Sequence, residues 1–159
     1  MARTRIPRIA LTFLAALALL LTGPLAAAPS AEAAVVKPLD IVKIHYDPVG
    51  RDQPNNRGYN QEFIQLKNTS ARTLDLTGYV IRDERPQRFA FPKGFKLGAG
   101  KTVTIRSGHG KNTASTLYWG KKSYIWNNDG DTARTFNAQG KLLERCSYKK
   151  VPKRTTVAC

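Results

Sequence analysis

Short alternations of apolar and polar residues recur along the chain after residue 34, and they are typical of β-strands that bury one face. Segment 101–107 (KTVTIRS) is the cleanest, because Val103 and Ile105 point one way and the threonines beside them point the other. Comparable segments lie at 40–46, 62–68, 76–83, 88–92, 117–119, 132–136 and 142–148. No window keeps apolar residues at helical spacing for more than a turn. We therefore predict an all-β sandwich or barrel of about eight short strands.

The same alternation predicts which side chains fill the interior. On the inner faces we expect, in chain order, Val42, Ile44, Ile64, Leu66, Tyr79, Ile81, Phe91, Val103 and Ile105. Segment 47–60 (DPVGRDQPNNRGYN), between the first two strands, is rich in turn-forming residues and is expected to be an irregular loop.

The first 33 residues have a pattern of their own. Three arginines precede an apolar run at 9–21, and a stretch of small residues ends in Ala31, Glu32 and Ala33. This order is typical of a secretory signal peptide, and the run is shorter than the about 20 residues that a spanning helix needs. We predict cleavage after Ala33 and secretion of residues 34–159, with a membrane anchor as the less favoured alternative.

The charge of the chain is strongly positive. Without the three arginines and one glutamate of residues 1–33, the formal charge falls from +15 to +13. Such a charge bears on partners and solubility and says nothing of the fold. The partners it favours are polyanions: nucleic acid, anionic cell-envelope polymers or acidic lipid surfaces.

Both cysteines lie near the C-terminus, at Cys146 and Cys159. An even pair in an exported protein is most simply a disulfide. Free thiols or an intermolecular bridge remain as the alternative.

The stretch NNDGD at 127–131 gathers carboxylates and amides in a basic chain. Asp129 and Gly130 suit the central positions of a type I′ turn, so we predict a hairpin between strands. A calcium loop of the EF-hand type is the alternative, but Phe136 stands where its last glutamate is needed.

Several segments also match, in order, the motifs of a known family. They are EFIQLKN (62–68), LDLTGYVIRD (74–83), FAFP (89–92), LGAGKTVTIRSGHG (97–110) and WNNDGDTA (126–133). On these motifs, which cover most of residues 40–148, the chain resembles the lamin tail domain in its exported bacterial form. Tyr79 stands where the family often has Trp, and Thr135 where an aliphatic residue is common.

The resemblance implies an immunoglobulin-like β-sandwich of about eight or nine strands. It also implies a binding or scaffolding role, since the related domain of nuclear lamins contacts proteins and nucleic acid. Bacterial versions are often attached to hydrolases, and we expect none in this sequence. The expected organisation is a signal peptide at 1–33, the sandwich at 34–148 and a basic tail at 149–159 tied by the disulfide.

Residues that could support catalysis are few. His45 shares the polar face of its strand with Lys43, and His109 lies between glycines in SGHGKNT. We predict that this loop is a plain turn; the alternative is a general base or an anion-binding loop. It does not match the phosphate-binding loop motif, because Ile105 occupies a position where that motif needs glycine. We predict no catalytic residues, no metal and no cofactor, and keep a small secreted hydrolase using His109 as the least favoured function.

The surface charge is the remaining functional signal. As a hypothetical polyanion site we select basic residues near the last strands: Lys121, Lys122, Lys149, Lys150, Lys153 and Arg154. The favoured function is a secreted module that binds anionic polymers such as DNA or wall polymer; the alternative is a protein-interaction or structural domain with a dispersed cationic surface. Four aromatics nearby suit the core better than a stacking platform: Tyr118, Trp119, Tyr124 and Trp126.

Overall fold

The computed structural model describes residues 37–159, so the predicted signal peptide at 1–33 lies outside the described residues. The elements in chain order are β1 (Leu39–His45), α1 (Asn56–Tyr59), β2 (Phe63–Asn68), β3 (Leu74–Asp75), β4 (Val80–Arg82), β5 (Arg88–Ala90), β6 (Lys96–Leu97), β7 (Thr102–Arg106), β8 (Thr116–Tyr118), β9 (Gly130–Phe136), β10 (Leu142–Lys149) and β11 (Thr156–Ala158). Within this part of the chain no helix is both long and apolar enough to cross a membrane.

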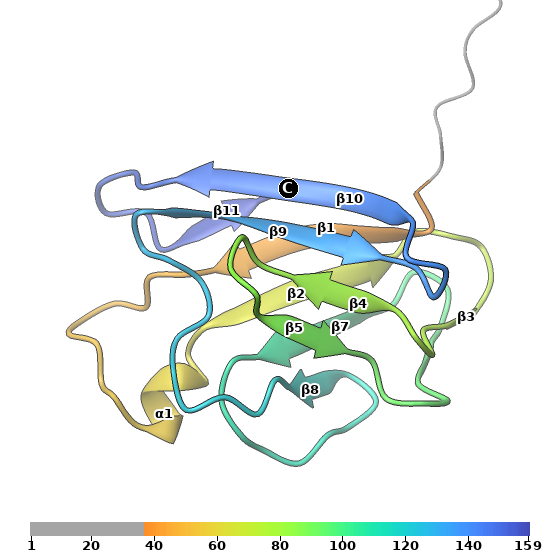
Figure 1. Cartoon of the computed structure of the whole chain (residues 1–159), viewed down its shortest axis with the longest axis horizontal. Helices are drawn as coiled ribbons and strands as arrows, with labels where there is room; N and C mark the ends of the chain where they lie inside the picture. The colour runs from red at the N-terminus through yellow and green to blue at the C-terminus, as the bar shows by residue number, and fades with distance from the viewer. Residues whose placement is uncertain (1–36) are drawn as a thin grey trace, which may run out of the picture. The chain divides into compact units, whose positions relative to one another are not determined.

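The strands form two facing sheets. One has the order β11-β1-β2-β7-β8 and the other β10-β9-β4-β5, while β3 and β6 pair separately. In Figure 1 the four-stranded sheet lies in front of the five-stranded one. All pairs are antiparallel except β7 with β8. The predicted immunoglobulin-like β-sandwich is therefore confirmed. The sequence pattern did not predict three of the strands, namely β3, β6 and β11.

The interior between the sheets is apolar and rich in aromatic rings. Seven of the nine predicted inner residues are buried: Ile44, Ile64, Leu66, Ile81, Phe91, Val103 and Ile105. Trp119 and Trp126 also lie in this core, with ring centroids 5.8 Å apart in an edge-to-face arrangement. Both tryptophans are therefore core residues, as expected.

Two predictions of inward-facing residues are wrong. A bulge in β1 between Ile41 and Lys43 shifts the strand relative to β2. Because one extra residue reverses the alternation, Leu39 and Ile41 are buried ahead of the bulge and Ile44 after it, and Val42 stays partly exposed. Tyr79 precedes β4 and packs against the margin of the core, only partly buried.

The NNDGD stretch is a turn, but the hairpin prediction is wrong. Residues 119–129 form a loop, so no strand precedes the turn. The Gly130 amide donates to the carbonyl of Asn127 over 3.2 Å, which places Asn128 and Asp129 at the centre. Neither has a positive φ, which excludes type I′.

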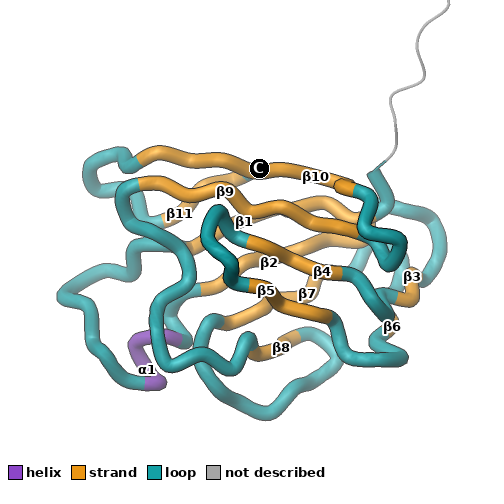
Figure 2. The backbone as a smooth tube through the Cα atoms, viewed as in Figure 1, coloured by secondary structure: helices purple, strands orange, loops and turns teal. Residues whose placement is uncertain are grey.

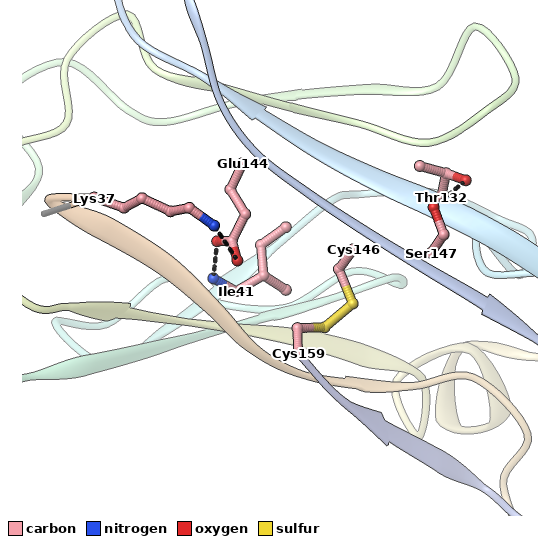
Figure 3. Close-up of a disulfide and its surroundings, with 7 residues drawn as sticks. All are labelled: Lys37, Ile41, Thr132, Glu144, Cys146, Ser147 and Cys159. Carbon is pink, nitrogen blue, oxygen red and sulfur yellow. Dashed lines mark hydrogen bonds and ion pairs between the residues drawn. A yellow bond between two sulfur atoms is a disulfide. The ribbon is translucent and has the colours of Figure 1, made fainter. Parts of the chain in front are cut away.

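The C-terminus joins the sandwich rather than only extending it. β11 pairs with the outer edge of β1, with Ile44 opposite Val157. The predicted disulfide is confirmed: Cys146 of β10 is bonded to Cys159 after β11, with Cα atoms 5.8 Å apart (Figure 3). Because β10 and β11 belong to different sheets, this bond links the two layers at one side.

A buried carboxylate reinforces the same side. Glu144 of β10 accepts a hydrogen bond from the amide of Ile41 in β1, and its other oxygen lies 3.7 Å from Nζ of Lys37 (Figure 3). Burial raises the pKa of Glu144 to about 7, and the nearby Asp40 adds to the rise. The two sheets are thus joined covalently and by hydrogen bonding.

Candidate anion-binding surfaces

Four loops lie together at one end of the sandwich, which we call the loop end. β1, β4, β8 and β10 finish there, so the loops 46–62, 83–87, 119–129 and 150–155 all lie at this end (Figure 2). Contacts between the sheets agree: Tyr46 stacks on Tyr148 with centroids 4.2 Å apart, and Asn128 donates to Asp47 over 3.2 Å. All six predicted site residues lie at or beside this end.

Lys121 and Lys122 line a cleft of about 350 Å³ between the 119–129 loop and the segment around α1. Its other lining residues are Pro54, Asn55, Asn56, Tyr59 and His109. Lys122 is exposed and Lys121 partly so. The cleft therefore combines two ammonium groups, an imidazole and a phenol.

The wall that carries the lysines is held by backbone hydrogen bonds to the end of β7. The amide of Lys121 donates to the Ser107 carbonyl over 3.0 Å, and that of Gly120 to the Gly108 carbonyl over 2.9 Å. Gly120 has a φ of +75°, which a side chain would strain. The chain thus turns sharply just before the two lysines.

Glu62 anchors the second half of the same loop. Its carboxyl group is fully buried and accepts hydrogen bonds from the amides of Ile125 (2.7 Å) and Trp126 (3.0 Å) and from the Ser107 hydroxyl (2.7 Å). Burial raises the pKa of Glu62 to about 8, although these three hydrogen bonds oppose the rise. This buried carboxyl group therefore positions the loop and is closed to ligands.

His109 is fixed through its backbone and presents its ring to solvent. Its carbonyl accepts from the side-chain amides of Asn56 (3.0 Å) and Asn60 (2.9 Å), and its amide donates to Asn56 (2.7 Å). Among the hydrogen bonds of residues 37–159, none joins its ring to a carboxylate. It lacks the oriented acid partner that a general base of a hydrolase would need.

The other four predicted residues lie where β10 leads into β11. Lys149 lines a separate hollow of about 530 Å³, beside Asp129, Asp131 and Ser147. Lys150 pairs with Asp129, Nζ to Oδ1 3.2 Å. Lys153 and Arg154 are exposed in the 150–155 loop. Of the predicted set, Lys121 and Lys122 therefore line one hollow and Lys149 another, while the remaining three line neither, and Lys150 is paired with its neighbour Asp129.

Acidic side chains at the loop end are used in structural contacts. Asp131 accepts hydrogen bonds from the amides of Glu84, Asn127 and Thr132. Burial, and next the charge of Asp131, raises the pKa of Asp83. No group of three or more His, Cys, Asp or Glu side chains within residues 37–159 is placed to hold a metal ion.

A row of arginines crosses the four-stranded sheet, and this cationic feature was not predicted from the sequence. Arg88 lies opposite Arg82, Arg82 opposite Arg134, and Arg134 opposite Arg145. Each arginine is adjacent in sequence to a buried residue, so the outward direction of each could have been predicted. The alignment of the four could not, because it depends on the registers of three strand pairs.

A two-sheet sandwich with a shared apolar interior is an immunoglobulin-like domain. The family model for the Lamin Tail Domain matches residues 32–150, so the chain belongs to the lamin tail domain family. This family consists of non-catalytic immunoglobulin-like domains. No curated protein matches the chain.

Proposed function

We propose that the chain is a secreted, non-catalytic module that binds anionic polymers through its basic surface. The main support is charge that the fold leaves unneutralised. Residues 34–159 carry a formal +13, yet of the six predicted site residues only Lys150 forms an ion pair within the described chain. Exposed cations without acidic partners are available to phosphates, and each contact releases counterions from the polymer.

Secretion is part of the same proposal, since it follows from the signal-like pattern of residues 1–33. Outside the cytoplasm the accessible polyanions are DNA released from cells and polymers of the cell envelope. The family supports a binding or structural role in general, and the charge of this chain favours polyanions.

The test is a salt titration of binding with the chain from residue 34 to 159. Fluorescent duplex DNA and a poly(glycerol phosphate) of the teichoic-acid type serve as probes between 50 and 300 mM salt. We expect the logarithm of the association constant to fall linearly with the logarithm of salt concentration, by about 0.9 for each DNA phosphate contacted. Failure to bind either polymer, or binding that salt does not weaken, would contradict the proposal.

A further inference from the structure

The four arginines of the row lie side by side on one face. Residues directly opposite in antiparallel strands point to the same side of a sheet. The inner side is identified by buried neighbours: Ile81, Phe89, Ala133 and Cys146. Arg82, Arg88, Arg134 and Arg145 therefore all point outward, from β4, β5, β9 and β10. In Figure 1 this outer face is turned toward the viewer.

The row is left largely uncompensated by the rest of the protein. Within residues 37–159 no hydrogen bond or ion pair involves the side chain of Arg88, Arg145 or Arg82, and the last lies over the ring of Phe136 at 5.3 Å. Only Arg134 meets an acid, Glu84, at 3.9 Å. Like charges directly opposite one another destabilise a sheet, so this arrangement has a cost in the unbound protein.

The row also borders a hollow in the surface. Arg82, Arg88 and Arg134 line a groove of about 570 Å³, together with Arg85. Two acids are present in its wall, the buried Asp83 and the exposed Glu84. Four guanidinium groups thus outnumber the carboxylates, and the groove keeps an excess of positive charge.

The length of the row is comparable to that of a short run of phosphates on one DNA strand. Neighbouring strands lie about 4.8 Å apart, so four arginines on four strands span roughly 14 Å. One strand of a DNA duplex rises about 3.4 Å along the axis for each phosphate and also winds around that axis, so successive phosphates lie further apart than this rise and the row can meet about two or three of them. The planar fork of arginine suits phosphate oxygens by donating two parallel hydrogen bonds.

We propose that this arginine row is the binding site for the phosphate backbone of duplex DNA. The inference rests on the proposed polyanion-binding function. It places the main binding site on the outer face of the sheet β10-β9-β4-β5, and not at the loop-end lysines. It also explains why the fold keeps four like charges in register. The contacts are to the backbone, so binding is expected to be independent of base sequence.

The test compares charge-matched triple variants of residues 34–159. The row variant is Arg82→Gln, Arg88→Gln and Arg145→Gln, which spares Arg134 and its hydrogen bond to the Asp83 carbonyl. The control removes three exposed lysines elsewhere: Lys67→Gln, Lys93→Gln and Lys101→Gln. A third variant changes the loop end: Lys121→Gln, Lys122→Gln and Lys153→Gln.

At 0.1 M salt we expect the row variant to bind duplex DNA about tenfold to a hundredfold more weakly, with a log–log salt slope smaller by about two to three. The affinity of the control variant for DNA should lie within about threefold of that of the native chain, because salt screens the attraction between the DNA and lysines that lie far from it. Urea unfolding should show the row variant to be at least as stable as the native protein, which separates lost binding from lost folding.

Several results would overturn the assignment. Equal losses for all three variants would mean that only net charge matters, and a larger loss for the loop-end variant would place the site there; the proposed function would survive both. Poly(glycerol phosphate) or polyglutamate that competes as well as DNA, with the same sensitivity to the row variant, would remove the specificity for DNA. A native chain that binds no polyanion would overturn both proposals.

Discussion

Thr135 places a hydroxyl group in the interior of the sandwich. It lies on β9 opposite Ile81 and is 1% exposed, and its hydroxyl oxygen has no hydrogen-bond partner among residues 37–159. The family often has an aliphatic residue at this position. A buried hydroxyl without a partner costs free energy that an apolar group of the same shape avoids.

We therefore predict that Thr135→Val raises the free energy of unfolding by about 1 kcal/mol, measured by urea denaturation. Valine keeps the branched shape and its preference for strands. The matched control is Thr102→Val on β7, an exposed threonine, which should change stability by less than about 0.5 kcal/mol. A less stable Thr135→Val protein would mean that the hydroxyl has a partner after all.

At the scale of elements, the disulfide decides how firmly β11 is held. β11 has three residues and lies at the edge of the described five-stranded sheet, where it pairs with β1. The covalent bond from Cys159 to β10 limits how far this short edge strand can separate. Without it, the strand pairing alone must offset the conformational entropy of the last residues.

Replacing both cysteines, Cys146→Ala with Cys159→Ala, should lower the free energy of unfolding by about 3 kcal/mol. The bridged residues are 13 apart in sequence, which sets this magnitude in the chain-entropy account. Hydrogen exchange should also quicken for the amides of β11 and stay slow for those of β2, at the centre of the sheet. Unchanged stability, with β11 still protected, would show that the bond is dispensable.

The elements also show what the sequence could and could not predict. Strands such as β7 were predictable because Val103 and Ile105 alternate cleanly with threonines. The bulge in β1 was not, since Ile41, Val42 and Ile44 are all suited to burial and only pairing with β2 decides among them. The lysines at the loop end could be chosen by charge alone, whereas the arginine row required strand registers that no local pattern contains.

At the scale of the whole molecule, two buried carboxyl groups determine how stability changes with pH. The pKa of Glu62 is raised to about 8 and that of Glu144 to about 7, from 4.5 for an unperturbed glutamate. The folded protein therefore binds more protons than the unfolded chain between these limits. Its stability is highest below pH 4.5 as far as these groups are concerned, and is lost as pH rises toward 8.

We predict that the free energy of unfolding falls from pH 5 to pH 8 at constant ionic strength, by at most about 1.4 kcal/mol per pH unit for each group. Urea denaturation at intervals of one pH unit would show the slope. Glu144→Gln should flatten it, and Glu62→Gln should do so further up the pH range if that variant folds. Stability that rises over this interval would mean that both carboxylates are ionised in the folded state.

The central claim is that this lamin tail domain binds a polyanion on the outer face of its four-stranded sheet. The most direct measurement is a titration of ¹⁵N-labelled protein, residues 34–159, with a short DNA duplex, followed by amide and arginine side-chain chemical shifts. The account predicts that the largest changes fall on β4, β5, β9 and β10, at Arg82, Arg88, Arg134 and Arg145. Changes confined to the five-stranded sheet, or none at saturating DNA, would contradict it.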